Sequence, residues 1–123
     1  MKVIYTPDAP EAIGPYSQAI CAGNLVFTSG QIPINPASGL VEADTIEAQT
    51  EQVCKNIQAV LTAAGTSLDK VVKTVCFLST MDDFAAFNGV YSKYFTGKPA
   101  RSCVAVKTLP KNVLVEVDTI AEI

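Results

Sequence analysis

The chain has 123 residues, the size of one ordinary domain, and 49% of them are hydrophobic, which is enough to build a buried core. Twelve acidic residues against nine basic ones give a net charge of −3, which offers no general attraction for nucleic acid or an anionic membrane. Histidine is absent, which excludes the most common general base and zinc ligand. We therefore predict one domain, residues 1–123, whose chemistry uses no metal and rests on carboxylates, Arg, Tyr, Ser, Cys, the backbone and water.

The low charged fraction, 17%, indicates surplus apolar surface. No apolar run reaches the roughly eighteen residues of a membrane span, so this surface favours a subunit interface and a homo-oligomer. The segment Met1–Pro7 has neither the apolar core nor the cleavage site of a secretory signal. The four cysteines are far apart, without a C-x-x-C pair, which is typical of reduced thiols. We expect a cytoplasmic protein that binds neither membrane nor nucleic acid.

Three strands and a helix are predicted in the first half of the chain. The strands are expected at residues 2–5, 17–22 and 25–29. Asp44 followed by Glu47 has the spacing of a capping box, and apolar residues then recur at helical intervals. Gly65 is predicted to end this helix.

The second half of the chain alternates strands with one further helix. Strands are expected at residues 71–79, 102–107 and 113–122. The second helix is predicted to open after Thr80, to carry an apolar stripe from Phe84 to Tyr94, and to end at Gly97. This order predicts an α+β fold, in which two helices cover one face of a mixed sheet and a second subunit covers the other.

Two charged residues stand out near the end of the chain. Arg101 precedes an apolar strand, where its planar fork can bind a carboxylate, although an Arg at a strand end is most often a solvated surface residue. Glu116 lies on the mixed face of the last strand and is most simply a half-exposed strand residue. The short connection at 108–112 predicts an antiparallel hairpin between the two strands. If Cys103 pairs with Glu116, both charges face the same side, whereas a slip of one residue separates them.

Other polar residues lie at turns or on a helix face. Tyr16 follows a Gly-Pro turn, and Ser29 and Gly30 end a strand where a glycine lets backbone N–H groups approach a ligand. Turns also need Gly and Pro for steric reasons alone. Asn88 shares a helix face with Phe84, where it either caps a loop or lines a pocket.

Taken together, several segments closely resemble the reactive intermediate deaminase (Rid/YjgF) family, in particular its archetypal imine deaminase subgroup. The segments are Ala12–Ala19, Ser29–Pro33, Pro99–Cys103, Leu109–Pro110 and Val115–Val117. The match spans nearly the whole chain, and its C-terminal block is specific because it combines an Arg, a Leu-Pro turn and a strand Glu at defined offsets. The family commonly has Ile or Met after the glutamate, where this chain has Val117.

The resemblance implies a chorismate-mutase-like fold, assembled as a homotrimer with clefts between subunits. The implied activity is that of a 2-iminobutanoate/2-iminopropanoate deaminase, a hydrolase that converts 2-imino acids to 2-keto acids and ammonia without a cofactor. By this resemblance Arg101 holds the substrate carboxylate and Glu116 orients or activates water. The implied lining residues are Tyr16, Ser29, Gly30, Asn88 and Cys103.

Two other functions are weighed against the deaminase. The first is a trimer that uses the same cleft to bind a small carboxylate for regulation, without catalysis. The second is a ribonuclease or translation inhibitor, which the closeness of Lys98, Arg101 and Lys107 suggests and the acidic balance of the chain disfavours. Covalent catalysis by Cys103 is disfavoured because no histidine or C-x-x-C partner lowers the pKa of its thiol.

Overall fold

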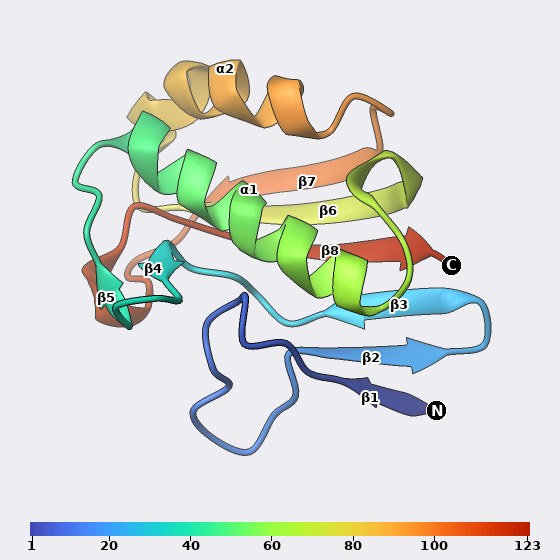
Figure 1. Ribbon diagram of the computed structural model, residues 1–123. Coiled ribbons are helices and arrows are strands. Elements are labelled where there is room, and N and C mark those ends of the chain that lie inside the picture. The colour runs from blue at the N-terminus through green and yellow to red at the C-terminus, as the bar shows by residue number, and fades with distance from the viewer.

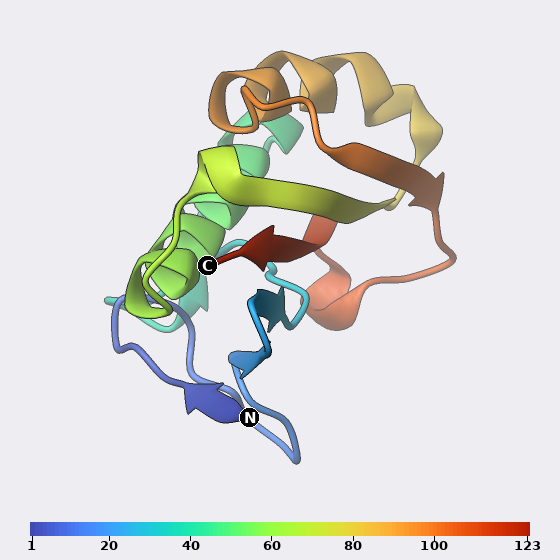
Figure 2. The same cartoon turned by 90° about the vertical axis from the view of Figure 1, so that its right-hand side faces the viewer.

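The computed structural model describes residues 1–123 as a six-stranded sheet with two helices packed on one face (Figures 1 and 2). The six strands and two helices predicted from the sequence are all present, which confirms the α+β class. A small hairpin, β4–β5, was not predicted. The elements are β1 (Lys2–Ile4), β2 (Ala19–Ala22), β3 (Leu25–Thr28), β4 (Ile34–Asn35), β5 (Leu40–Val41), α1 (Ile46–Ala63), β6 (Val71–Leu78), α2 (Phe84–Tyr94), β7 (Ala100–Ala105) and β8 (Val115–Glu122).

The order of strands in the sheet is β1-β2-β3-β8-β6-β7. All neighbours are antiparallel except β6 and β7, which are parallel and joined through α2. The predicted β7–β8 hairpin is therefore wrong, because β6 lies between the two strands. Parallel strands need a long crossover, which α2 supplies, and β8 then crosses back to pair with β6 on its inner side.

Alternate residues of the central strands form the core beneath the helices. On β8, Val115, Val117, Thr119 and Ala121 are buried, whereas the residues that alternate with them are half-buried. No element of the chain covers the opposite face, where Phe27 is 40% and Val104 48% exposed. Because the side chains of a strand alternate between faces, each residue of β6, β7 and β8 can be assigned to the helix-covered or the uncovered face.

The ends of both helices differ slightly from the prediction. The N-cap of α1 is Thr45 rather than Asp44, and its hydroxyl accepts a hydrogen bond from the Ala48 backbone at 3.2 Å. Gly65 has φ +86° and ends α1 as predicted, since its N–H donates to the Thr62 carbonyl in a Schellman arrangement. A short turn, Met81–Asp83, precedes α2, which ends at Tyr94 rather than at Gly97. Neither helix is long and apolar enough to cross a membrane.

Three buried amide side chains hold the loops beside the sheet. Gln18 accepts from the Thr6 N–H at 2.7 Å and donates to the Pro10 carbonyl at 2.8 Å, which fixes the N-terminal loop. Asn56 donates to two carbonyls of the segment that follows β3. Gln49 accepts from the Leu114 N–H at 2.8 Å, at the entrance to β8. Buried polar groups are costly unless paired, so these bonds fix the segments that carry the candidate site.

Candidate active site

Glu116 is half-buried on the uncovered face of the sheet, in direct contact with Gly30. A Cβ atom at Gly30 would lie 2.3 Å from Oε2 of Glu116, so a larger residue there would displace the carboxylate from its observed position. The neighbouring Gln31 exchanges two backbone hydrogen bonds with Val117, of 2.8 and 3.2 Å, which holds the two segments together. The approach of a ligand to the backbone at Gly30 stays a prediction, and the group that the structure shows beside Gly30 is the Glu116 carboxylate.

The Glu116 carboxylate opens into a hollow of about 310 Å³. The hollow is lined by Tyr16, Ser29, Gly30, Ile32, Pro110 and Glu116. The Ser29 hydroxyl donates to the Ser17 carbonyl at 2.6 Å, and this bond fixes the backbone beside Tyr16. Tyr16 is 53% exposed, so its phenol is accessible from solvent. Four of the residues predicted from the sequence thus meet here. We call this group the Glu116 half-site.

The environment of Glu116 raises the pKa of its carboxyl group above the ordinary value. Burial is the main cause, and the negative charge of Asp118, two residues along the same face, is the second. Burial also raises the pKa of Asp118, against the opposing effect of Lys73. A carboxyl group with a raised pKa is suited to exchange protons with water near neutral pH.

Arg101 lies near the start of β7 and faces α2. Its Nη1 donates to Oδ1 of Asn88 at 2.7 Å. Its guanidinium carbon lies 5.4 Å from the ring centre of Phe84 and 4.9 Å from that of Tyr91. Phe84, Asn88 and Tyr91 follow one another at i, i+4 and i+7, so one face of α2 supplies all three contacts.

A second hollow, of about 320 Å³, lies beside Arg101. Its lining residues are Asn88, Tyr91, Ser92, Phe95, Lys98, Pro99 and Arg101. Arg101 is only half-buried and has one side-chain acceptor, so most of its five N–H donors are free for a ligand carboxylate. We call this group the Arg101 half-site. The aromatic contacts with Phe84 and Tyr91 were missed in the sequence, because aromatic residues on a helical stripe indicate core packing.

Cys103 lies on the same face of β7 as Arg101, since it pairs with buried Cys76. Burial raises the pKa of the Cys103 thiol, and the positive charge of Arg101 opposes that shift only in part. The thiol therefore stays protonated at neutral pH, which is unfavourable for a nucleophile.

The two half-sites lie on opposite faces of the sheet within one chain. Arg101 pairs with Thr74, which is buried beneath the helices, whereas Glu116 pairs with Phe77 on the uncovered face. The sequence left two alternatives open, in which Arg101 and Glu116 lie on the same face or on different faces, and the structure has them on different faces. The two strands are not direct neighbours, because β6 lies between them.

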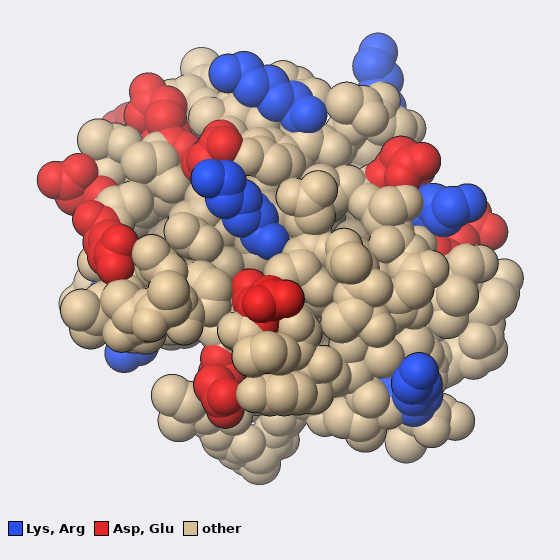
Figure 3. Space-filling view, in the orientation of Figure 1, with Lys and Arg blue, Asp and Glu red and all other residues tan.

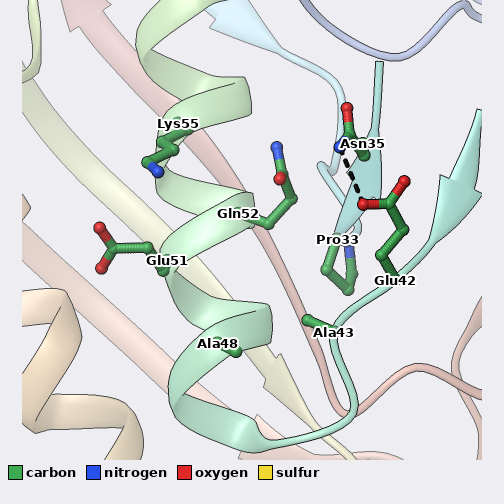
Figure 4. Close-up of a pocket in the computed structure, with 8 residues that line it drawn as sticks. All are labelled: Pro33, Asn35, Glu42, Ala43, Ala48, Glu51, Gln52 and Lys55. Atoms are coloured by element: carbon green, nitrogen blue, oxygen red, sulfur yellow. Dashed lines mark hydrogen bonds between the residues drawn. The ribbon is translucent and has the colours of Figure 1, made fainter. Parts of the chain in front are cut away.

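A third hollow lies between α1 and the β4–β5 hairpin (Figure 4), and it contains none of the predicted site residues. It is lined by Pro33, Asn35, Glu42, Ala43, Ala48, Glu51, Gln52 and Lys55. Asn35 donates to Glu42 at 3.1 Å, Gln52 donates to Asn56 at 2.9 Å, and Glu51 accepts from the Tyr94 hydroxyl. The first bond closes the hairpin, the second lies within α1, and the third joins α1 to α2, which is a structural role.

Comparison with known proteins assigns the class to which this fold and these segments belong. Residues 6–123 match the family model described as "Endoribonuclease L-PSP". The chain is 54% identical to AldR of Lactococcus lactis, named as a candidate regulator, over 100% of this chain and 98% of the relative. The chain is thus a Rid/YjgF fold protein by both sequence and architecture, and it belongs to the Rid/YjgF (L-PSP) family.

Two solved structures illustrate the similarity. YyfA of Yersinia pestis, described as a protein of the conserved Rid family, is 52% identical, with a TM-score of 0.96 over 99% of this chain and 98% of its own. TdcF of E. coli, whose crystal structure contains bound serine, is 42% identical, with a TM-score of 0.95 over 100% of this chain and 99% of its own. The similarity therefore extends over the complete fold.

Proposed function

We propose that this chain is a 2-imino acid deaminase that acts as a homotrimer, with one active site in each cleft between subunits. The observation that carries the proposal is the separation of Arg101 and Glu116 onto opposite faces of one sheet. One half-site has the free guanidinium that a substrate carboxylate needs, and the other has the half-buried carboxylate that water activation needs. Neither is sufficient alone, whereas two copies in contact can supply both.

A ring of three copies meets this requirement in a simple way. In a head-to-tail ring, each subunit presents one surface to its neighbour on one side and a different surface to its neighbour on the other. The Arg101 half-site of one copy then faces the Glu116 half-site of the next. The partly apolar, uncovered face of the sheet, with Phe27 and Val104 exposed, supplies surface for burial in such an assembly. The choice of three subunits for this ring comes from the family resemblance.

The proposed reaction adds water to the C=N bond of a short imine such as 2-iminobutanoate. Arg101 holds the carboxylate of the substrate, which places the imine carbon next to a water molecule held by Glu116. Glu116 accepts a proton from this water as the C–O bond forms. It then returns that proton to the nitrogen. As the C–N bond breaks and ammonia leaves, the hydroxyl proton of the adduct passes to Glu116 and on to water, which gives the C=O bond of the 2-keto acid. A protonated imine is a strong electrophile, so the residues present are sufficient for this step.

The bound serine of TdcF supports the ligand class. Serine has a carboxylate and a nitrogen on the adjacent carbon, as a 2-imino acid does. A ligand of this size also fits the scale of the two hollows, each of which is of the order of 300 Å³.

The relative AldR supports a second candidate function, a regulator that binds a small carboxylate in the same cleft without turnover. The ribonuclease named in the family description has less support, because the helix face shows acidic and basic side chains interspersed, without a continuous basic surface (Figure 3). Catalytic turnover of an imine separates the deaminase from the regulator.

Mixing two inactive variants tests the proposal. Arg101→Ala and Glu116→Gln are each expected to lose most of the hydrolysis of 2-iminobutanoate generated in situ. When equal amounts are unfolded and refolded together, about one cleft in four receives both functional groups, and about a quarter of the wild-type activity returns. Each variant refolded alone is the control. No recovery in mixed trimers would contradict a cleft shared between subunits, and an inactive wild type would contradict the deaminase itself.

Replacing Asp118 with asparagine is expected to move the acid limb of the kcat/KM profile to lower pH. The charge of Asp118 contributes to the raised pKa of Glu116, so its removal lowers that pKa and ionises Glu116 at lower pH. The activity that depends on ionised Glu116 then persists into more acidic solution. Asp82 is exposed, lies outside the Glu116 half-site and does not affect the pKa of Glu116, so Asp82→Asn removes the same charge and serves as the matched control. If the acid limb of the kcat/KM profile lies at the same pH in Asp118→Asn as in the wild type, Glu116 is not the general base.

A further inference from the structure

The Tyr91 side chain lies at the centre of an aromatic group beneath Arg101. Its ring centre lies 4.5 Å from that of Phe95 in a stacked arrangement and 5.4 Å from that of Phe87. The Arg101 guanidinium carbon lies 4.9 Å from the same ring. Burial raises the pKa of Tyr91, so the ring remains a neutral phenol that attracts the cation through its π electrons.

The Tyr91 hydroxyl has one side-chain partner, the fully buried Thr74. The two hydroxyl oxygens lie 2.8 Å apart. Thr74 is the residue of β6 that pairs directly with Arg101 of β7, so its side chain and that of Arg101 face the helices together. The Cys76 thiol, 3.8 Å from the same Thr74 oxygen, completes the group. The hydroxyl pair therefore connects α2 to the sheet directly beside the guanidinium.

We propose that Thr74 and Tyr91 are positioning residues, which fix the Arg101 guanidinium in the orientation that receives the substrate carboxylate. This inference rests on the proposed function and deepens it. An arginine side chain has several rotatable bonds, and its bidentate fork works only in a narrow range of orientations. Asn88 holds one end of the guanidinium, and the Tyr91 ring limits its tilt. The ring stays in place because rotation away from Arg101 breaks a buried hydrogen bond.

The test uses Thr74→Val, which keeps the shape of the side chain and removes the hydroxyl. Two substrates are compared: 2-iminobutanoate and the matched imine in which a carboxamide replaces the carboxylate. We expect kcat/KM for the carboxylate substrate to fall about tenfold, mainly through KM, the size of effect expected when a desolvated cation–π contact is lost. Hydrolysis of the carboxamide, which does not use the charge of Arg101, is expected to change less than about twofold.

Three further variants separate positioning from folding. Thr74→Ser keeps the hydroxyl and is expected to restore the wild-type preference for the carboxylate. Tyr91→Phe keeps the ring and is expected to show the same loss of preference as Thr74→Val, without addition in the double variant. Thr119→Val is the matched control. Thr119 lies on β8, where it pairs with Thr74 of β6 and is equally buried, but its hydroxyl bonds to Thr28 rather than to Tyr91. It is expected to lower stability and leave the preference unchanged.

A binding measurement keeps this inference separate from the proposed function. Titration with 2-oxobutanoate, followed by calorimetry, reports carboxylate binding without turnover. If the wild type binds the keto acid but hydrolyses no imine, the proposed function fails, and a Kd about tenfold weaker in Thr74→Val still supports the positioning role. Equal losses on both substrates, or unchanged binding in Thr74→Val and Tyr91→Phe, overturn the positioning role. If the wild type neither binds 2-oxobutanoate nor hydrolyses the imine, both the proposed function and the positioning role are overturned.

Discussion

Replacing Arg101 with alanine is expected to lower kcat/KM for 2-iminobutanoate about a hundredfold, because two charge-assisted hydrogen bonds to the carboxylate are lost. The loss is expected in KM first, since the carboxylate is bound in both the ground state and the transition state. The assay follows the disappearance of imine generated in situ. Arg101 is half-buried, and its side chain takes no part in the backbone hydrogen bonds between strands. We therefore expect its replacement to leave the fold intact.

Arg101→Lys and Lys93→Ala are the controls for this result. The lysine keeps the positive charge but not the planar fork, so we expect it to recover only part of the lost activity. Lys93 is an exposed cation of α2 outside the half-site, and its removal changes the net charge by the same amount. Equal rates for the wild type and Arg101→Ala would falsify the role of Arg101 as the carboxylate clamp.

Replacing Glu116 with glutamine is expected to lower kcat about a hundredfold, the usual contribution of a general base, with a small change in KM. Glutamine has nearly the same shape and keeps the contact with Gly30, but it cannot take a proton from water. Steady-state kinetics with 2-iminobutanoate provides the measurement. A large rise in KM at unchanged kcat would instead assign Glu116 to substrate binding.

The same Glu116→Gln variant is expected to melt at a higher temperature than the wild type at neutral pH. The pKa of Glu116 is raised in the folded chain, so folding favours the protonated form, and the ionised form costs stability as the pH rises through that pKa. Glutamine is never ionised and avoids this cost. The difference in melting temperature is expected to disappear in acid, below the ordinary pKa of a glutamate, where the wild-type side chain is protonated in both states. A difference that persists there would indicate a packing effect.

The elements of this fold could be predicted from local patterns. The apolar periods of α1 and β8 and the glycine at position 65 indicated where each element lies, because helices, alternating strands and turns depend on residues close in sequence. The β4–β5 hairpin was missed because each of its strands has only two residues, too few to show an alternation.

Whether Arg101 and Glu116 lie on the same face of the sheet could not be predicted from local patterns, because it depends on the order of the strands. The short connection before β8 favoured a hairpin, whereas the succession of β6, α2 and β7 favoured a parallel unit with a helical crossover. The second pattern prevailed in the structure. If the β6–α2–β7 pattern is given priority, it predicts that β7 lies beside β6. The position of β8 on the other side of β6 depends on contacts between segments far apart in the sequence, which local patterns do not show.

The candidate residues were found through the family resemblance, and the structure adds the contacts between them. Gly30 is a clear case: the turn suggested that a backbone approaches a ligand, but the contact with Glu116 joins segments more than eighty residues apart. Thr74 had no local signal at all, because a threonine within an apolar strand is ordinary. Its relation to Arg101 follows from strand pairing and the packing of α2.

The separation of the two charges onto opposite faces has a genetic consequence under the proposed assembly. Each copy contributes its arginine to one cleft and its glutamate to another, so a copy that lacks both inactivates two of the three clefts of the trimer. Such an allele interferes with its normal counterpart in the same cell instead of merely failing to contribute. Selection therefore acts on the two faces of the sheet as one unit, although within a single chain they never meet.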